Sequence, residues 1–125
     1  SNKGSIRIIS GTHRGRKLPV LMAEGLRPTT DRVKETVFNW LMPYIQDSKC
    51  LDCFAGAGSL GFEAISRGAS SVRCIELDKN AARQLTQNKT TLAAAWKPEN
   101  MKVAAYVHEY VNSKIVYQGK EVMAA

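Results

Sequence analysis

The chain has 125 residues, enough for one small domain of roughly 100–150 residues. Apolar residues make up 44% and charged residues 23%, ordinary values for a globular protein, and no apolar run approaches the roughly 18 residues of a membrane-spanning helix. The first residues do not resemble an export leader, and the chain has three cysteines, an odd number. We therefore expect reduced thiols and a cytoplasmic location, with no membrane partner.

The net charge is concentrated near the start of the chain. Residues 1–34 hold eight Lys/Arg and two Asp/Glu, so they carry +6 of the net charge of +7. A basic segment joined to a nearly neutral body predicts a polyanionic partner, most simply a nucleic acid. A solvated basic face that aids solubility explains the charge equally well.

Residues 1–46 are predicted to form a basic hairpin followed by one helix. Ile6–Ile9 and Leu18–Val20 are typical of short strands, and the segment between them contains the turn residues Gly11 and Gly15. Such a segment would form a separate N-terminal extension of the domain.

The helix of this extension is expected to begin at Thr30 or Asp31, either of which is a good N-cap. Pro43 is expected to end or kink the helix. Phe38 and four further apolar residues, spaced as one helical face, are predicted to enter the core. These four are Val33, Val37, Trp40 and Leu41.

Residues 47–125 are predicted to form a partial doubly wound α/β domain. The expected elements are a strand over Cys50–Phe54, a glycine loop, a helix over Ser59–Arg67 ended by Gly68, a strand over Val72–Glu76, and a helix from Lys79 to about Thr91 capped by Asp78. After Leu92 we expect only two weak strands, over residues 103–111 and 115–117. This is too little to complete such a sheet, so we expect segments to be missing there.

The glycine loop indicates a nucleoside cofactor. Gly56–Gly61 fits the pattern G-x-G-x-x-G between a strand and a helix, which offers backbone N–H groups to a ligand. Glu76 lies 20 residues after Gly56, at the end of the next strand, where its carboxylate can accept the hydroxyl groups of a ribose. These features fit NAD and S-adenosylmethionine equally well.

Asp52 favours S-adenosylmethionine over NAD. Its carboxylate lies in the strand that leads into the loop, where it would repel a pyrophosphate. Two unit charges about 4 Å apart interact by roughly 4 kcal/mol at an effective dielectric constant of about 20. A ligand with a sulfonium and an ammonium group would instead be attracted.

Cys50 and Cys53 form a C-x-x-C pair, which can indicate zinc or redox chemistry. The remaining candidate ligands, Cys74, His13 and His108, have unsuitable spacings for a zinc site. Two cysteines three positions apart in a strand also point to opposite faces. We predict that they are small buried strand residues and that no metal is bound.

Five segments occur in the order Ile6–Ile9, His13–Pro19, Leu26–Leu41, Leu51–Ala64 and Ile75–Asp78. With them the chain resembles the RsmD-type 16S ribosomal RNA methyltransferases from about residue 6 to about residue 92. The resemblance implies a class I Rossmann-like methyltransferase sheet, incomplete in this chain, with an N-terminal hairpin and helix. It also implies methyl transfer from S-adenosylmethionine to the exocyclic N2 of a guanine in small-subunit (16S) rRNA, free or in an assembling subunit.

The resemblance also implies roles for individual residues. The cofactor would be lined by Asp52, Phe54, Gly56, Ala57, Gly58, Glu76, Leu77 and Asp78. RNA would be bound by basic residues of the extension, namely Arg7, Arg14, Arg16, Lys17, Arg27 and Arg32. Residues 1–46 would then be an RNA-binding extension of the methyltransferase domain.

The family's catalytic motif, [D/N]-P-P-[F/Y], has no counterpart in the chain. The four prolines are isolated from one another, at Pro19, Pro28, Pro43 and Pro98. The sequence therefore assigns no catalytic residue. Two alternatives stay open, namely part of an NAD-type oxidoreductase, from the glycine spacing alone, and a non-catalytic RNA-binding module, from the basic extension.

Overall fold

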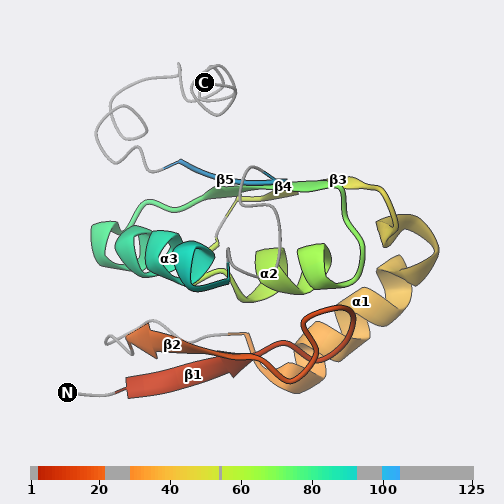
Figure 1. Cartoon of the computed structure of the whole chain (residues 1–125), viewed down its shortest axis with the longest axis horizontal. Helices are drawn as coiled ribbons and strands as arrows, with labels where there is room; N and C mark the ends of the chain where they lie inside the picture. The colour runs from red at the N-terminus through yellow and green to blue at the C-terminus, as the bar shows by residue number, and fades with distance from the viewer. Residues whose placement is uncertain (1–2, 22–28, 54, 93–99, 105–125) are drawn as a thin grey trace.

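The computed structural model describes residues 3–21, 29–53, 55–92 and 100–104. A parallel sheet forms one layer, and two helices, α2 (Ser59–Ser66) and α3 (Lys79–Leu92), cover one of its faces (Figure 1). A β-hairpin and α1 (Asp31–Ile45) lie on the far side of these helices from the sheet. None of the described helices is long and apolar enough to cross a membrane.

The hairpin is formed by β1 (Lys3–Arg7) and β2 (Lys17–Leu21), which pair antiparallel with Ile6 opposite Leu18. Ile6 and Leu18 are buried in the same core cluster as Phe62 and Leu85 of α2 and α3. The predicted hairpin is therefore confirmed, and one hydrophobic core includes the hairpin and both helices. The division of the chain at residue 46 stays a prediction.

Helix α1 begins as predicted, with Thr30 Oγ1 accepting a hydrogen bond from the Val33 N–H. Pro43 does not end it, because the helix continues to Ile45. The proline lies in the last turn, where its missing N–H removes one helical hydrogen bond and little helix follows.

The predicted burial of Phe38 is confirmed, but the rest of the predicted buried face of α1 is wrong. Among its residues, Lys34, Phe38 and Ile45 are buried, whereas Trp40 is 71% exposed and Val33 51% exposed. Leu41 is exposed as well. The helix carries two stripes at helical spacing, and the stripe that holds Lys34 faces the hairpin and α2 because polar partners for its ammonium lie there.

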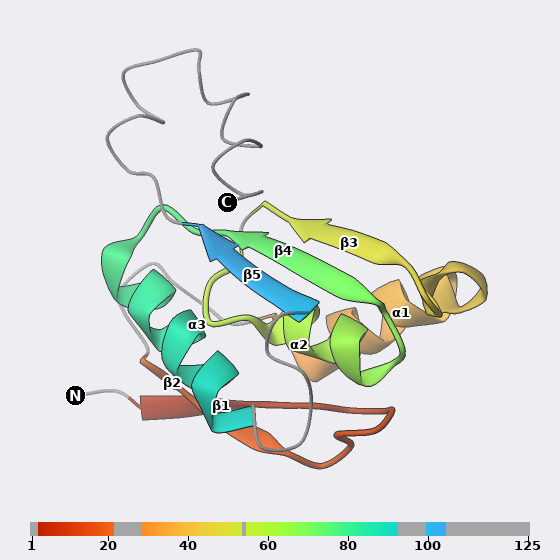
Figure 2. The same cartoon turned by 45° about the horizontal axis from the view of Figure 1, so that its top comes forward.

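The sheet consists of β3 (Lys49–Asp52), β4 (Ser71–Ile75) and β5 (Met101–Ala104), in the order β3-β4-β5. Both pairs are parallel, so the three strands end at the same edge of the sheet (Figure 2). This strand–helix–strand–helix–strand arrangement, with both helices on one face, is the opening of the predicted doubly wound sheet. Of the two weak strands predicted for the end of the chain, the first is seen only in part, as β5, which begins at Met101 rather than at residue 103. Residues 105–111 and the second predicted strand, 115–117, lie outside the described residues.

Candidate cofactor site and nucleic-acid surface

The predicted cofactor residues that the structure describes meet at the carboxyl edge of the sheet. Asp52 is the last residue of β3, and Glu76 directly follows β4, the strand that pairs with β3. The Ala55 N–H donates to the Ile75 carbonyl at 3.1 Å, which holds the start of the glycine loop beside the end of β4. Ligands of open α/β sheets bind at this edge.

Glu76 links the two loops that leave the sheet at this edge. Its Oε1 accepts a hydrogen bond from the Gly56 N–H at 2.7 Å, and its Oε2 accepts one from the Asp78 N–H at 2.7 Å. Asp78 in turn caps α3, since its Oδ1 accepts from the Ala81 N–H at 2.8 Å. Each carboxylate oxygen has a second lone pair, so Glu76 can still accept hydrogen bonds from the hydroxyl groups of a ribose. Leu77 lies half-buried between these two acids.

The two glycines of the loop have different surroundings. Both have positive φ, 55° at Gly56 and 98° at Gly58. A Cβ on Gly58 would lie 2.4 Å from the Phe62 ring and 2.5 Å from a Leu85 methyl carbon, whereas a Cβ on Gly56 would meet no described atom within 4 Å. Gly58 therefore serves packing, and Gly56 leaves open space beside the backbone.

The loop also leaves backbone donors for a ligand. Gly58 is the N-cap of α2 and supplies no side-chain cap. Within the described part of the chain, the N–H groups of Ala57 and Ser59 form no hydrogen bond. A carboxylate could bind at these donors, at the positive end of the helix dipole.

Asp52 places negative charge at the same edge. The residue is half-buried and pairs in register with Cys74, which is fully buried. Burial raises the pKa of the Cys74 thiol, and the charge of Asp52 raises it further. Asp52 and Glu76 thus make the edge suited to a positively charged ligand. Phe54, the remaining predicted cofactor residue, lies outside the described residues.

The basic residues of the extension are only partly brought together. Arg14, Arg16 and Lys17 are exposed at the turn of the hairpin and the start of β2. Arg7 is engaged with Asp31 at 2.8 Å, in an ion pair whose two side chains are about half exposed. Arg32 is exposed on α1, and Arg27 lies outside the described residues.

The cysteines do not all occupy the predicted positions. Cys50 is half-buried in β3, as a strand residue, but Cys53 is exposed. The predicted burial of Cys53 is wrong because β3 ends at Asp52, which leaves Cys53 in the following turn. The described residues contain no group of three or more His, Cys, Asp or Glu that could hold a metal ion.

Three buried polar residues around the loop were not predicted. Lys34, Glu63 and Asn88 are at most 1% exposed and form hydrogen bonds between the hairpin, the helices and the loop. For two of them the sequence contains an indication of burial. Asn88 lies three residues after Leu85 and four before Leu92, both buried, and Glu63 is the one charged residue of the apolar helix α2.

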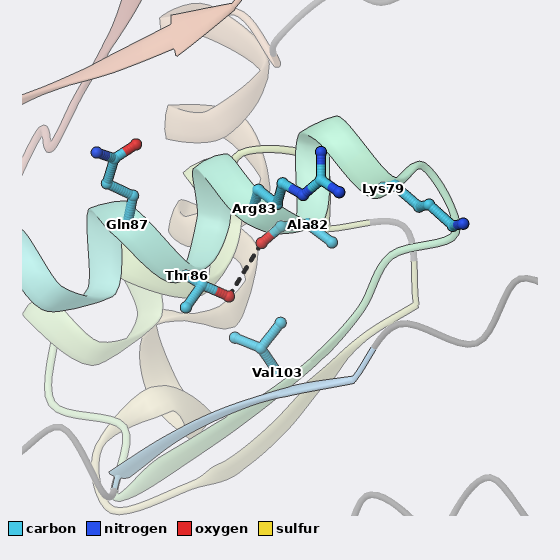
Figure 3. Close-up of a pocket in the computed structure, with 6 residues that line it drawn as sticks. All are labelled: Lys79, Ala82, Arg83, Thr86, Gln87 and Val103. Carbon is cyan, nitrogen blue, oxygen red and sulfur yellow. Dashed lines mark hydrogen bonds between the residues drawn. The ribbon is translucent and has the colours of Figure 1, made fainter.

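A separate hollow of about 530 Å³ lies between α3 and β5 (Figure 3). Val103 of β5 faces the helix there, and the Thr86 hydroxyl donates to the Ala82 carbonyl at 3.0 Å. Lys79 and Arg83 stand at its rim with Gln87. None of the predicted cofactor residues that the structure describes lines this hollow, although Lys79 directly follows Asp78 in the chain.

Comparison with solved structures identifies the class of fold. The structure "Putative methyltransferase yhhF" from Escherichia coli is 48% identical, with a TM-score of 0.71, covering 89% of this chain and 58% of that one. An RNA methyltransferase from Salinibacter ruber, solved with S-adenosyl-L-homocysteine, has the same fold at 14% identity, with a TM-score of 0.56, over 71% of this chain and 54% of its own. The three-stranded parallel sheet with α2 and α3 is therefore part of a class I methyltransferase fold, as predicted.

The family follows from the sequence matches. Residues 6–118 match the family described as Conserved hypothetical protein 95, and the chain belongs to that family. Ribosomal RNA small subunit methyltransferase D of Haemophilus influenzae is 69% identical over 90 residues, which are 72% of this chain and 47% of that protein. The predicted RsmD-type membership is confirmed. The chain spans about half the length of the curated relatives it matches.

Proposed function

We propose that the protein transfers a methyl group from S-adenosylmethionine to the exocyclic N2 of a guanine in small-subunit rRNA. The observation that carries the proposal is the pair of carboxylates, Asp52 and Glu76, on either side of a glycine loop at the carboxyl edge of the sheet. The names of the relatives support rRNA as the acceptor.

The residues present fit S-adenosylmethionine. Glu76 would accept hydrogen bonds from the ribose hydroxyls. The N–H groups of Ala57 and Ser59 would donate hydrogen bonds to the carboxylate of the methionine part. Asp52 would attract the ammonium and sulfonium charges. The open space beside Gly56 allows a ligand to approach the backbone. When bound, the cofactor supplies a methyl group on a positively charged sulfur.

The exposed cations of the hairpin would bind the phosphates of the RNA and so set its position. Arg14, Arg16 and Lys17 are the residues best placed for this role, because they form no ion pair among the described residues. Arg7 would contribute less, since Asp31 already neutralises it.

Calorimetric titration tests the cofactor. S-adenosylmethionine should bind the chain and NAD should not, and Asp52→Asn should weaken the binding of S-adenosylmethionine. Binding of NAD alone would favour the oxidoreductase alternative. Binding of RNA without either cofactor would favour the RNA-binding module.

Methyl transfer tests the reaction. A polypeptide that contains this chain and has the length of the relatives should label 16S rRNA, free or in small-subunit particles, with methyl groups from S-adenosylmethionine. Mapping of the label to a guanine N2 is the expected result. Transfer to another atom or another RNA would contradict the proposed acceptor.

A further inference from the structure

Lys34 of α1 connects the hairpin to the glycine loop. Its Nζ donates to the Arg7 carbonyl of β1 at 2.6 Å and to Ser59 Oγ, directly after the loop, at 3.0 Å. The side chain is 1% exposed, and Glu63 Oε1 lies 3.5 Å from the same ammonium. A single buried cation thus bonds the first strand of the hairpin and the first residue of α2.

Asn88 of α3 makes an equivalent connection on the other side. Its Nδ2 donates to the Pro19 carbonyl of β2 at 3.2 Å and to the Ala57 carbonyl of the glycine loop at 3.2 Å. The residue is fully buried. Each strand of the hairpin is therefore joined to the loop region by one buried side chain that comes from a third element.

We propose that Lys34 and Asn88 are positioning residues that couple RNA binding on the hairpin to cofactor binding in the glycine loop. The proposal rests on the proposed function, which places RNA on the hairpin and S-adenosylmethionine at the loop.

The physical reason is that neither side chain can follow one partner and leave the other without cost. A buried donor or acceptor that loses its hydrogen bond is destabilised, because no water replaces the lost partner. When the loop and the start of α2 are ordered, the Ala57 carbonyl accepts from Asn88 and the Ser59 hydroxyl accepts from Lys34. In the same positions, Asn88 and Lys34 also donate hydrogen bonds to the hairpin. A ligand that orders one region lowers the cost of ordering the other, which gives positive cooperativity.

The coupling is expected to be reciprocal. A 16S rRNA transcript should tighten S-adenosylmethionine binding by about fivefold or more, and S-adenosylmethionine should tighten RNA binding by the same factor. The measured quantity is the ratio of the dissociation constants of S-adenosylmethionine without and with saturating RNA, at one fixed salt concentration.

Asn88→Leu tests the coupling because leucine is similar in size and removes both donated hydrogen bonds. The ratio should fall toward one. Ser66→Ala is the matched control, since Ser66 Oγ bonds the Ser10 carbonyl and the His13 N–H of the hairpin turn but not the loop. Ser66→Ala should lower the melting temperature and leave the ratio near that of the unchanged protein.

A second measurement needs no variant. Hydrogen exchange of the unchanged protein should slow at the Ile8 and Gly15 amides, which form hydrogen bonds within the hairpin, when S-adenosylmethionine alone is added. Unchanged exchange at these amides would overturn the proposal, as would an unchanged ratio in Asn88→Leu. If neither S-adenosylmethionine nor RNA binds the unchanged protein, the proposed function itself fails, which separates the two outcomes.

Discussion

The Gly56 N–H donates a hydrogen bond of 2.7 Å to Glu76 Oε1, which joins two residues 20 positions apart. Glu76→Ala removes this acceptor and the one used by the Asp78 N–H. We expect the affinity for S-adenosylmethionine to fall about tenfold or more, since a hydrogen bond to a charged group contributes about 1.5–3 kcal/mol. Calorimetric titration measures the change. Glu35→Ala, which removes an exposed acid of α1, is the control and should bind normally.

The glycines of the loop should respond differently to alanine. Gly58→Ala should lower the free energy of unfolding by about 2–4 kcal/mol, because its Cβ would overlap Phe62 and Leu85. Gly56→Ala should cost only about 1 kcal/mol, from its positive φ. Chemical denaturation measures both. Gly56→Ala should nevertheless weaken cofactor binding, and normal binding would show that no ligand approaches this backbone.

Cys74 should make the protein less stable at alkaline pH. Burial raises the pKa of its thiol in the folded state above the ordinary value of 9.0, so above about pH 9 the unfolded chain loses a proton that the folded chain keeps. The contribution of this group to the free energy of unfolding should therefore fall by up to about 1.4 kcal/mol per pH unit.

Cys74→Ala isolates that effect. Lys34 acts in the opposite direction, because burial lowers the pKa of its ammonium, and its contribution to stability grows as the pH rises toward 10.5. The difference between the unchanged protein and Cys74→Ala cancels the lysine contribution. We expect this difference to shrink above pH 9 in denaturation measured at several pH values, and a constant difference would contradict the prediction.

Charge reversal on the hairpin should weaken RNA binding. The double variant Arg14→Glu, Arg16→Glu removes two exposed cations. Its affinity should be lower at every salt concentration. The slope of log affinity against log salt should also fall by about 1.4, on the basis of roughly 0.7 per phosphate of a single strand. The double variant Lys49→Glu, Lys102→Glu makes the same charge change on exposed strand residues. It should change the slope far less.

Much of the fold follows from local sequence signals. Gly68, with φ of 107°, follows the end of α2 within two residues, and Asp78 caps α3, as their residue types predict. The glycine loop and Glu76 could be placed at one edge because parallel strands end together. These features are determined by residues that are near one another in the sequence.

The buried face of α1 could not be predicted in this way. The apolar spacing favoured burial of Val33 and Trp40, but burial depends on what packs against the helix. On the face that packs against the hairpin and α2, Lys34 contacts the Arg7 carbonyl and Glu63. A lysine is almost never fully buried without a partner, and these partners are distant in the sequence. The burial of Asn88 could not be predicted for the same reason, because its acceptors belong to β2 and the loop.

The burial of Lys34 also makes it a chemical probe. Amine-reactive reagents modify lysines that solvent can reach, such as the exposed Lys17, Lys49 and Lys102. Lys34 is 1% exposed beneath the hairpin, so it can react only while the hairpin is lifted from α1 and α2. The rate at which Lys34 is acylated, relative to Lys49, therefore reports how often the hairpin opens.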